Sequence, residues 1–246
     1  MNSCKLYLIP FLVVVLATNF SCKKSANNSL SNTRIAALDI THNGGVRHYH
    51  IVYDRFNNVD SFVVVGGGYD TGYNGYTFFN YIGSSYNITD GTGSFLSIYA
   101  YSNGLILKVL QKDTLNMLYN SSNQLAEINV VSPITRYPYD SVTFIYYNWN
   151  NGDMTDYNSN GVNWKYDYDN SHTGQIGDAI RINEFLTYGR SFIKSNHIPK
   201  DFYTGNIMTE QYLYTYDGSG RISVFTKILV DHTGRPNDTT TYSYFY

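Results

Sequence analysis

Residues 214–225, YTYDGSGRISVF, hold the pattern that decides the fold of this chain. Tyrosines alternate with other residues up to Asp217, and apolar residues resume at Ile222. An aspartate accepts hydrogen bonds from the backbone just after it and so begins a turn, and Gly220 suits the left-handed backbone that closes it. The stretch therefore predicts a β-hairpin whose ascending strand carries tyrosines.

A period of two along both strands assigns the faces of this hairpin. The residues that we expect to share one face are Tyr212, Tyr214 and Tyr216 on the ascending strand and Ile222, Val224 and Ile228 on the returning strand. Leu213 and Phe225 then interrupt the opposite, more polar face. This alternation is typical of strands and not of helices.

The same turn pattern recurs along the chain, which makes the hairpin a repeated unit. A Tyr is followed by Asp or Asn, two variable residues, Gly or Asn, a polar residue and then an apolar residue. Tyr53–Val59 and Tyr119–Leu125 follow this form, and irregular copies begin at Tyr101, Tyr147 and Tyr168. One such turn is weak evidence, but several in one chain indicate an internal repeat of hairpins.

Strand-like runs separated by turn residues fill most of the chain. Strands are expected at residues 46–54, 60–67, 76–83, 95–102, 105–112, 114–120, 125–131, 140–149, 162–168, 208–216, 221–230 and 239–246. Residues 179–186, AIRINEFL, predict one short helix without an evident capping residue. Together these runs predict an all-β fold, an antiparallel meander of long hairpins that forms a curved sheet or an open (half) barrel.

Composition supports a β fold and limits the function. Aromatic residues are 17% of the chain, with 26 Tyr, whereas charged residues are only 15%. Tyr favours strands and tolerates half-burial with its hydroxyl in water. The formal net charge of −2 gives no electrostatic basis for binding nucleic acid.

The first residues predict export. Lys5 is followed by an apolar run over residues 6–17, shorter than the roughly 20 residues that cross a bilayer as a helix. Residues 1–21 are therefore expected to be a signal peptide. Ser21 before Cys22 suits lipoprotein processing, and an ordinary cleaved signal with an incidental cysteine is the alternative.

Cys22 would be the single thiol of the processed chain, since Cys4 leaves with the signal. This count excludes a disulfide or a cysteine-ligated metal and favours lipidation of Cys22, which would hold the protein on a membrane. Residues 22–33 are then the lipidated Cys with a flexible tether, and residues 34–246 form a single domain of β-hairpin repeats.

Several of these motifs together resemble a known group of proteins. The leader ending SCKK, the hairpin YLYTYDGSGRISVF and the final TTTYSYFY resemble Bacteroidota lipoproteins of unknown function, which are built from long β-hairpins in a porin-like sheet. SNHIPKDF at residues 195–202 is similar to the segment before the last hairpin in that group. The Tyr-Asp-x-x-Gly-Arg-Ile pattern also resembles YD-repeat proteins. The resemblance implies architecture and an envelope location, and it supplies no catalytic residues.

The resemblance also bears on the side of the membrane. Surface-exported lipoproteins of this type carry acidic residues directly after the Cys, whereas this chain has Lys23 and Lys24. The expected location is therefore the outer membrane, with the periplasmic side favoured over the cell surface.

Two histidines are candidates for a metal site. His48 and His50 lie on one face of a predicted strand, and Asp54 follows on the same side if the strand continues. A polar strand face exposed to water is the alternative.

A second candidate is a calcium loop. Asp167 and Asp169 begin a run of oxygen-bearing residues that ends at Asp178 with EF-hand-like offsets. The sixth position of such a loop requires Gly, and this chain has His172 there. A divergent hairpin turn is the alternative.

An aromatic group is a candidate for sugar binding. Trp149 and Trp164, with Tyr147 and Tyr166, could form a platform that stacks on sugar rings, and ordinary sheet packing is the alternative. Ser219 lies in a hairpin turn and lacks the strand-to-helix elbow of a serine hydrolase.

No acid–base pair, nucleophile or ligand set converges in the sequence, so we expect no catalytic residues, no cofactor and no enzymatic activity. The expected function is a structural or binding role of a cell-envelope lipoprotein, with a membrane and an envelope protein or glycan as partners. A carbohydrate-binding lipoprotein that serves glycan uptake is the alternative.

Lipidation can be tested directly. In cells fed labelled palmitate, the wild-type protein should incorporate label and Cys22→Ala should not, because the thioether would form on that sulfur. Equal labelling of the two proteins would refute the anchor.

Overall fold

Antiparallel strands form nearly all of the part of the chain that is described by the computed structural model, namely residues 34–67, 75–83, 85–90, 95–102, 105–132 and 141–246. Residues Ile35–Tyr246 form one compact unit. The elements are β1 (Ala37–His42), β2 (Gly45–Tyr53), β3 (Val59–Gly67), β4 (Gly75–Ile82), β5 (Ser85–Asp90), β6 (Phe95–Ser102), β7 (Leu105–Leu110), β8 (Thr114–Tyr119), β9 (Leu125–Ser132), β10 (Ser141–Asn150), β11 (Asp153–Ser159), β12 (Val162–Thr173), α2 (Ala179–Tyr188), β13 (His197–Thr204), β14 (Ile207–Tyr216), β15 (Ile222–Leu229) and β16 (Asp238–Phe245).

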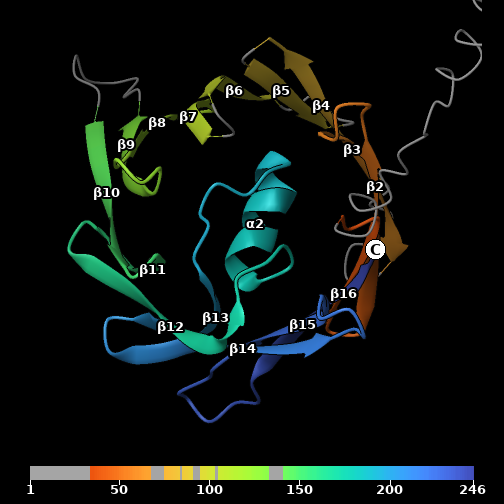
Figure 1. Ribbon diagram of the computed structural model, residues 1–246. Helices are drawn as coiled ribbons and strands as arrows, with labels where there is room; N and C mark the ends of the chain where they lie inside the picture. The colour runs from red at the N-terminus through yellow and green to blue at the C-terminus, as the bar shows by residue number, and fades with distance from the viewer. Residues whose placement is uncertain (1–33, 68–74, 84, 91–94, 103–104, 133–140) are drawn as a thin grey trace, which may run out of the picture. The chain divides into compact units, whose positions relative to one another are not determined.

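Each strand pairs with the next one along the chain, so the predicted antiparallel meander is confirmed. The expected strands are present, and the structure adds strands at β1, β5, β11 and β13. The form of the sheet goes beyond the curved sheet or open (half) barrel that we expected. β1 also pairs with β16, from Ala37 opposite Phe245 to His42 opposite Thr240, and this ladder closes the ring of sixteen strands (Figure 1).

The repeated turn has one hydrogen-bonding pattern in its regular copies. Asp217 Oδ1 accepts from the backbone N–H groups of Ser219 and Arg221, at 2.8 and 3.0 Å. The equivalent acceptors at the other two copies are the side-chain oxygens of Asp54 and Asn120. The residue with positive φ, which only Gly and Asn adopt readily, is Asn57, Asn123 or Gly220. The turn predicted from the sequence is therefore confirmed.

A β-bulge next to each of these turns corrects the predicted faces of the last hairpin. The register shifts between Thr215 and Tyr216, so that Ile222 lies opposite Tyr216 while Phe225 lies opposite Tyr214. Phe225 is 1% exposed and belongs to the core. Val224 lies opposite Thr215 on the other face of the sheet. The faces predicted for Val224 and Ile228 were therefore wrong. The bulge shifts the register by one residue, so the side chains of the returning strand lie on the faces opposite to those predicted.

The copy that begins at Tyr147 also differs from its predicted form. Asn151 and Gly152 both have positive φ, 50° and 85°, and form a two-residue hairpin turn. Trp149 takes the place of the strand-ending Tyr, and it lies opposite Met154 across another register shift.

Aromatic side chains at the strand ends connect neighbouring hairpins. Each donates a hydrogen bond from its hydroxyl or indole N–H to a backbone carbonyl close to the start of the preceding strand. These bonds are Tyr53 to Ile35 (2.8 Å), Tyr119 to Ile106 (2.8 Å), Trp149 to Leu125 (2.7 Å), Tyr168 to Met154 (2.7 Å) and Tyr246 to Ile222 (2.8 Å). All five accepting residues are at most 1% exposed, so the bonds satisfy carbonyls of buried residues.

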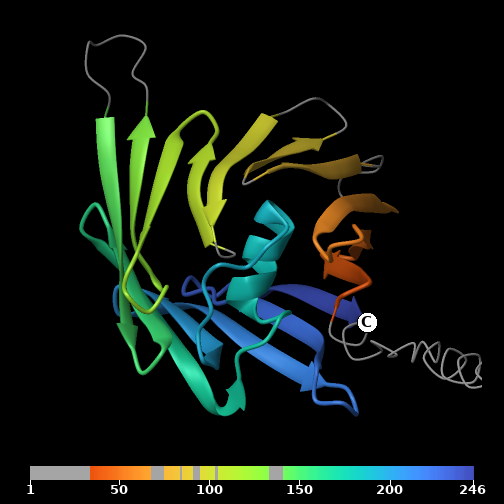
Figure 2. The same cartoon turned by 45° about the horizontal axis from the view of Figure 1, so that its top comes forward.

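The copy that begins at Tyr168 does not return directly as a strand. β12 and β13 pair as far as Thr173 opposite His197, and residues 174–196, here called the inner segment, connect them. The inner segment contains α2, which the ring of strands surrounds in both views (Figures 1 and 2). Ile182 and Phe185 of α2 belong to the same core cluster as the strand residues.

The predicted helix is confirmed and continues to Tyr188, and its caps are residues that the sequence analysis did not identify. Asp178 is the N-cap and accepts from the backbone N–H of Arg181, and Gly189 is the C-cap with φ 69°. Among the described residues, no helix is both long and apolar enough to cross a membrane.

The end of α2 gives a test of its position. Gly189→Ala should lower the free energy of unfolding by about 2–4 kcal/mol, because alanine resists positive φ and its Cβ would lie 2.7 Å from Cε1 of Phe79. Gly205→Ala is the matched control, since Gly205 has φ 61° but no atom within 4 Å of the added Cβ, and about 1 kcal/mol is expected. Equal losses in urea unfolding would contradict packing of Phe79 against this helix end.

Candidate functional site

The inner segment is hydrogen-bonded to the wall at its beginning. The hydroxyl of Tyr244 on β16 donates to the carbonyl of Gly177 at 2.9 Å. The side chain of Gln175 accepts from the backbone N–H of Ile222 and donates to the carbonyl of Gly220, at 3.1 and 3.3 Å. These contacts fix the start of the segment to β15 and β16.

The far end of α2 is held by a different part of the wall. The hydroxyl of Tyr86 on β5 donates to the carbonyl of Tyr188 at 2.7 Å. Arg190 donates to the side chain of Asn58, in the turn between β2 and β3, at 2.6 Å. The segment therefore bridges strands that are far apart in the ring.

The end of the inner segment is bonded to the turn between β10 and β11. The backbone N–H of Asn196 donates to the carbonyl of Gly152 at 3.0 Å, and its amide side chain donates to the carbonyl of Asn151 at 2.8 Å. Ser195 Oγ accepts from the backbone N–H of Met154 and contacts the hydroxyl of Tyr168, at 3.1 and 3.0 Å.

Buried carboxylates hold the backbone of the inner segment. Glu184 Oε2 accepts from the hydroxyl of Ser191 and the backbone N–H groups of Phe192 and Ile193, at 2.9, 2.9 and 3.0 Å. Burial raises the pKa of Glu184 to about 8. Burial likewise raises the pKa of the capping Asp178 to about 6, and Arg181 and the backbone donors oppose this shift.

A third carboxylate binds the residue that directly follows the inner segment. Asp153, at the start of β11, is 7% exposed. Its two oxygens accept from the backbone N–H of His197 and contact the Nδ1 of the same residue, both at 2.8 Å. No sequence pattern links the two residues, since 44 positions separate them, and the return of the inner segment to the β10–β11 turn brings them together.

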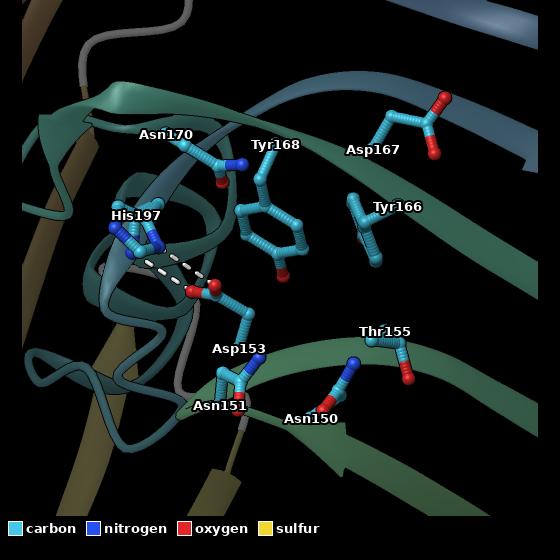
Figure 3. A pocket seen from close by; sticks show the side chains of 9 residues that line it. All are labelled: Asn150, Asn151, Asp153, Thr155, Tyr166, Asp167, Tyr168, Asn170 and His197. Carbon is cyan, nitrogen blue, oxygen red and sulfur yellow. Dashed lines mark hydrogen bonds and ion pairs between the residues drawn. The ribbon is translucent and has the colours of Figure 1, made fainter.

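A cavity of about 470 Å³ lies beside the Asp153–His197 pair (Figure 3). β11 and β12 pair only from Ser159 opposite Val162 to Asp156 opposite Lys165, and beyond that point the two strands separate. The residues that line the resulting opening are Asn150, Asn151, Asp153, Thr155, Tyr166, Asp167, Tyr168, Asn170 and His197.

Of the four residues predicted as a sugar platform, Tyr147, Trp149 and Trp164 lie outside this cavity, and Tyr166 lines it. Tyr147 and Trp164 stack on the two sides of Tyr157, with ring centroids 5.6 and 5.0 Å apart. Trp149 donates its indole N–H to Leu125, and Tyr166 packs against Phe202. The structure therefore brings Tyr147 and Trp164 together through a third ring, but it does not gather the four side chains into one surface.

The predicted histidine site is not assembled as a metal centre. His48 bonds the carboxylate of Asp39 across the β1–β2 ladder, at 2.7 Å. Asp54, expected to join His48 and His50, instead accepts from Phe56 and Asn58 in its own turn. Within the described ranges, no group of three or more His, Cys, Asp or Glu side chains is placed to hold a metal ion.

The predicted calcium loop is also not formed. Asp169 bonds Ser171 and His172 within its own turn, and these hydrogen bonds, with those from Ser171 largest, lower its pKa to about 2. Asp167 lies opposite Asp201 in the β12–β13 ladder, and Asp178 caps α2. These oxygens do not converge because the chain enters the inner segment where the loop would have to close. Cys22 lies outside the described residues.

The raised pKa of Glu184 predicts a pH dependence of stability. Glu184 titrates near 4.5 in the unfolded chain and near 8 in the folded one, so the folded protein binds the extra proton between these values and the free energy of unfolding falls as pH rises from about 5 to about 8. Glu184→Gln should reduce this fall, because its amide is neutral throughout. Glu127→Gln, a half-exposed position on β9, should retain it. Identical slopes for wild type and Glu184→Gln in urea unfolding would refute the assignment.

Comparisons with known proteins show the fold. No family model and no curated protein matches the chain. A porin-like protein from Bacteroides uniformis has a TM-score of 0.64 at 12% identity, over 87% of this chain and 98% of that one. A porin-like protein from Bacteroides vulgatus has a TM-score of 0.57 at 13% identity, over 87% of this chain and 99% of that one. At these identities, the likeness establishes a shared porin-like fold alone.

Proposed function

We propose that this chain is a non-enzymatic lipoprotein of the cell envelope, in which a filled β-barrel serves as a rigid scaffold. The observation that carries the proposal is the fixation of the inner segment. Wall residues bond both of its ends, and the buried carboxylates of Asp153, Asp178 and Glu184 all accept from backbone N–H groups within or next to it. Acidic groups engaged in this way serve structure and are not poised for acid–base chemistry.

The distribution of side chains over the wall supports a barrel with a packed interior. The interior holds Leu38, Ile106 and Phe225, each at most 1% exposed. Charged residues such as Lys165 and Asp167 are exposed on the strands. The wall also exposes apolar side chains, such as Phe144 at 42% and Leu213 at 50%.

The proposed location follows from the leader. Lipid on Cys22 would anchor the chain to the outer membrane, with the periplasmic side favoured because Lys23 and Lys24 replace the acidic residues of surface-exported lipoproteins. The porin-like fold of the two Bacteroides proteins is consistent with an envelope protein.

The second candidate function is carbohydrate binding in the service of glycan uptake. One observation favours it, namely the polar cavity between β11 and β12, whose lining combines amides with two tyrosines. The partner in this case is a glycan, and no chemical step is required of the protein.

Conductance measurements test the filled scaffold. The purified full-length lipoprotein, added to a planar lipid bilayer, should give no discrete conductance steps, because the interior is packed around α2. A trimeric porin measured in the same chamber is the positive control. Reproducible single-channel steps from the wild-type protein would overturn the proposal.

A further inference from the structure

We infer that the cavity between β11 and β12 binds a neutral sugar through the side-chain amides of Asn150, Asn151 and Asn170. This inference rests on the second candidate function and assigns its site. The site shares Tyr166 with the expected platform, but it does not include Tyr147, Trp149 or Trp164, whose rings are committed to the packing of the wall.

The cavity is held open by the architecture. β11 remains paired with β10 up to Asn150 opposite Asp153, while β12 continues along β13 with Tyr168 opposite Pro199. The two strands therefore diverge, and Tyr168 and His197 lie in the gap between them (Figure 3).

Hydrogen bonds fix the groups that form its floor. The hydroxyl of Tyr168 donates to the carbonyl of Met154 at 2.7 Å, and Asp153 holds His197 through two contacts of 2.8 Å. A site whose lining is already ordered loses little conformational entropy when a ligand binds.

The polar lining matches the chemistry of hydroxyl groups. Within the described part of the chain, the side-chain amides of Asn150, Asn151 and Asn170 have no intramolecular hydrogen bond, whereas the floor residues are engaged. Each amide offers two donors and an acceptor, and each sugar hydroxyl offers a donor and acceptors. Tyr166 and Tyr168 both line the cavity, and since Tyr166 packs against Phe202, Tyr168 supplies the apolar contact for a sugar ring.

The charges of the lining exclude other small ligands. None of the described lining residues is Lys or Arg, and Asp167 is acidic, so phosphates and carboxylates are disfavoured. A metal ion is disfavoured because the carboxylates of Asp153 and Asp167 do not point toward each other (Figure 3). The volume of about 470 Å³ falls within the range of small-molecule sites, roughly 300–1,000 Å³.

Binding can be measured with the full-length protein and a panel of neutral sugars. The panel contains glucose, galactose, mannose, xylose, N-acetylglucosamine and their oligomers, screened on a glycan array and then titrated by calorimetry. Asn150→Ala and Asn170→Ala should each weaken the affinity roughly 2- to 10-fold, the effect of one lost hydrogen bond. Thermal unfolding should be unchanged, because these amides hold no other part of the chain.

Two further variants locate the site. Asn206→Ala removes an exposed amide in the β13–β14 turn, outside the cavity, and should bind sugar like wild type. Tyr146→Ala removes a 49% exposed ring from β10 that does not line the cavity, and it should also bind like wild type.

The results distinguish a wrong binding site from a protein that binds no sugar. Sugar binding that Tyr146→Ala or Trp164→Ala abolishes, and that Asn150→Ala and Asn170→Ala leave intact, would overturn the cavity while keeping carbohydrate binding. Failure of every sugar in the panel to bind would overturn both the site and the second candidate function.

Discussion

The aromatic donors at the strand ends connect the sheet from one hairpin to the next. A closed barrel with a largely apolar interior must satisfy the backbone carbonyls of its buried residues within the protein. Here a tyrosine hydroxyl or a tryptophan N–H reaches across from the neighbouring hairpin, as Tyr119 does to Ile106 and Tyr246 to Ile222. The same side chain fills core volume with its ring and donates from its tip, which explains a Tyr-rich chain with few charges.

The repeated hairpins and the inner segment together fill the interior of the barrel. Sixteen strands enclose more space than the wall side chains alone would fill. The chain fills part of that space by extending the β12–β13 connection inward as α2. The interior is thereby partly polar at defined points, since Glu184 and Asp178 satisfy the backbone of the inserted segment. The Asp153–His197 pair lies at the end of the inner segment. It also forms one side of the cavity.

Local chemistry allowed much of the fold to be predicted. The turns at Asp54, Asn120 and Asp217 depend on residues within one short stretch, so their hydrogen-bonding pattern can be inferred from the sequence. The faces of the strand from Ile222 could not be inferred, because a bulge exchanges them without any residue that marks it. The orientation of Trp149 and Trp164 also required the three-dimensional structure, since alternation does not say which face is inside.

The candidate site was less accessible to prediction than the fold. Asp153, Asn170 and His197 come from three different strands, and each is an ordinary strand residue in its own context. They line one cavity only because β11 and β12 diverge while the inner segment returns to the β10–β11 turn. A sequence pattern relates residues that are close along the chain, whereas the residues of this site are close only across the sheet.

The ladder between β1 and β16 has a consequence for the order of events during biogenesis. The contact between His42 and Thr240 joins residues 198 positions apart, so the ring cannot close until the last strand has been made. Contacts of such long range carry the largest loop-closure entropy and form slowly. Until then the chain has two unpaired edges, one at each end, which can pair with other extended polypeptides. Protection of these two edges until the ring closes is therefore a requirement that this topology places on folding.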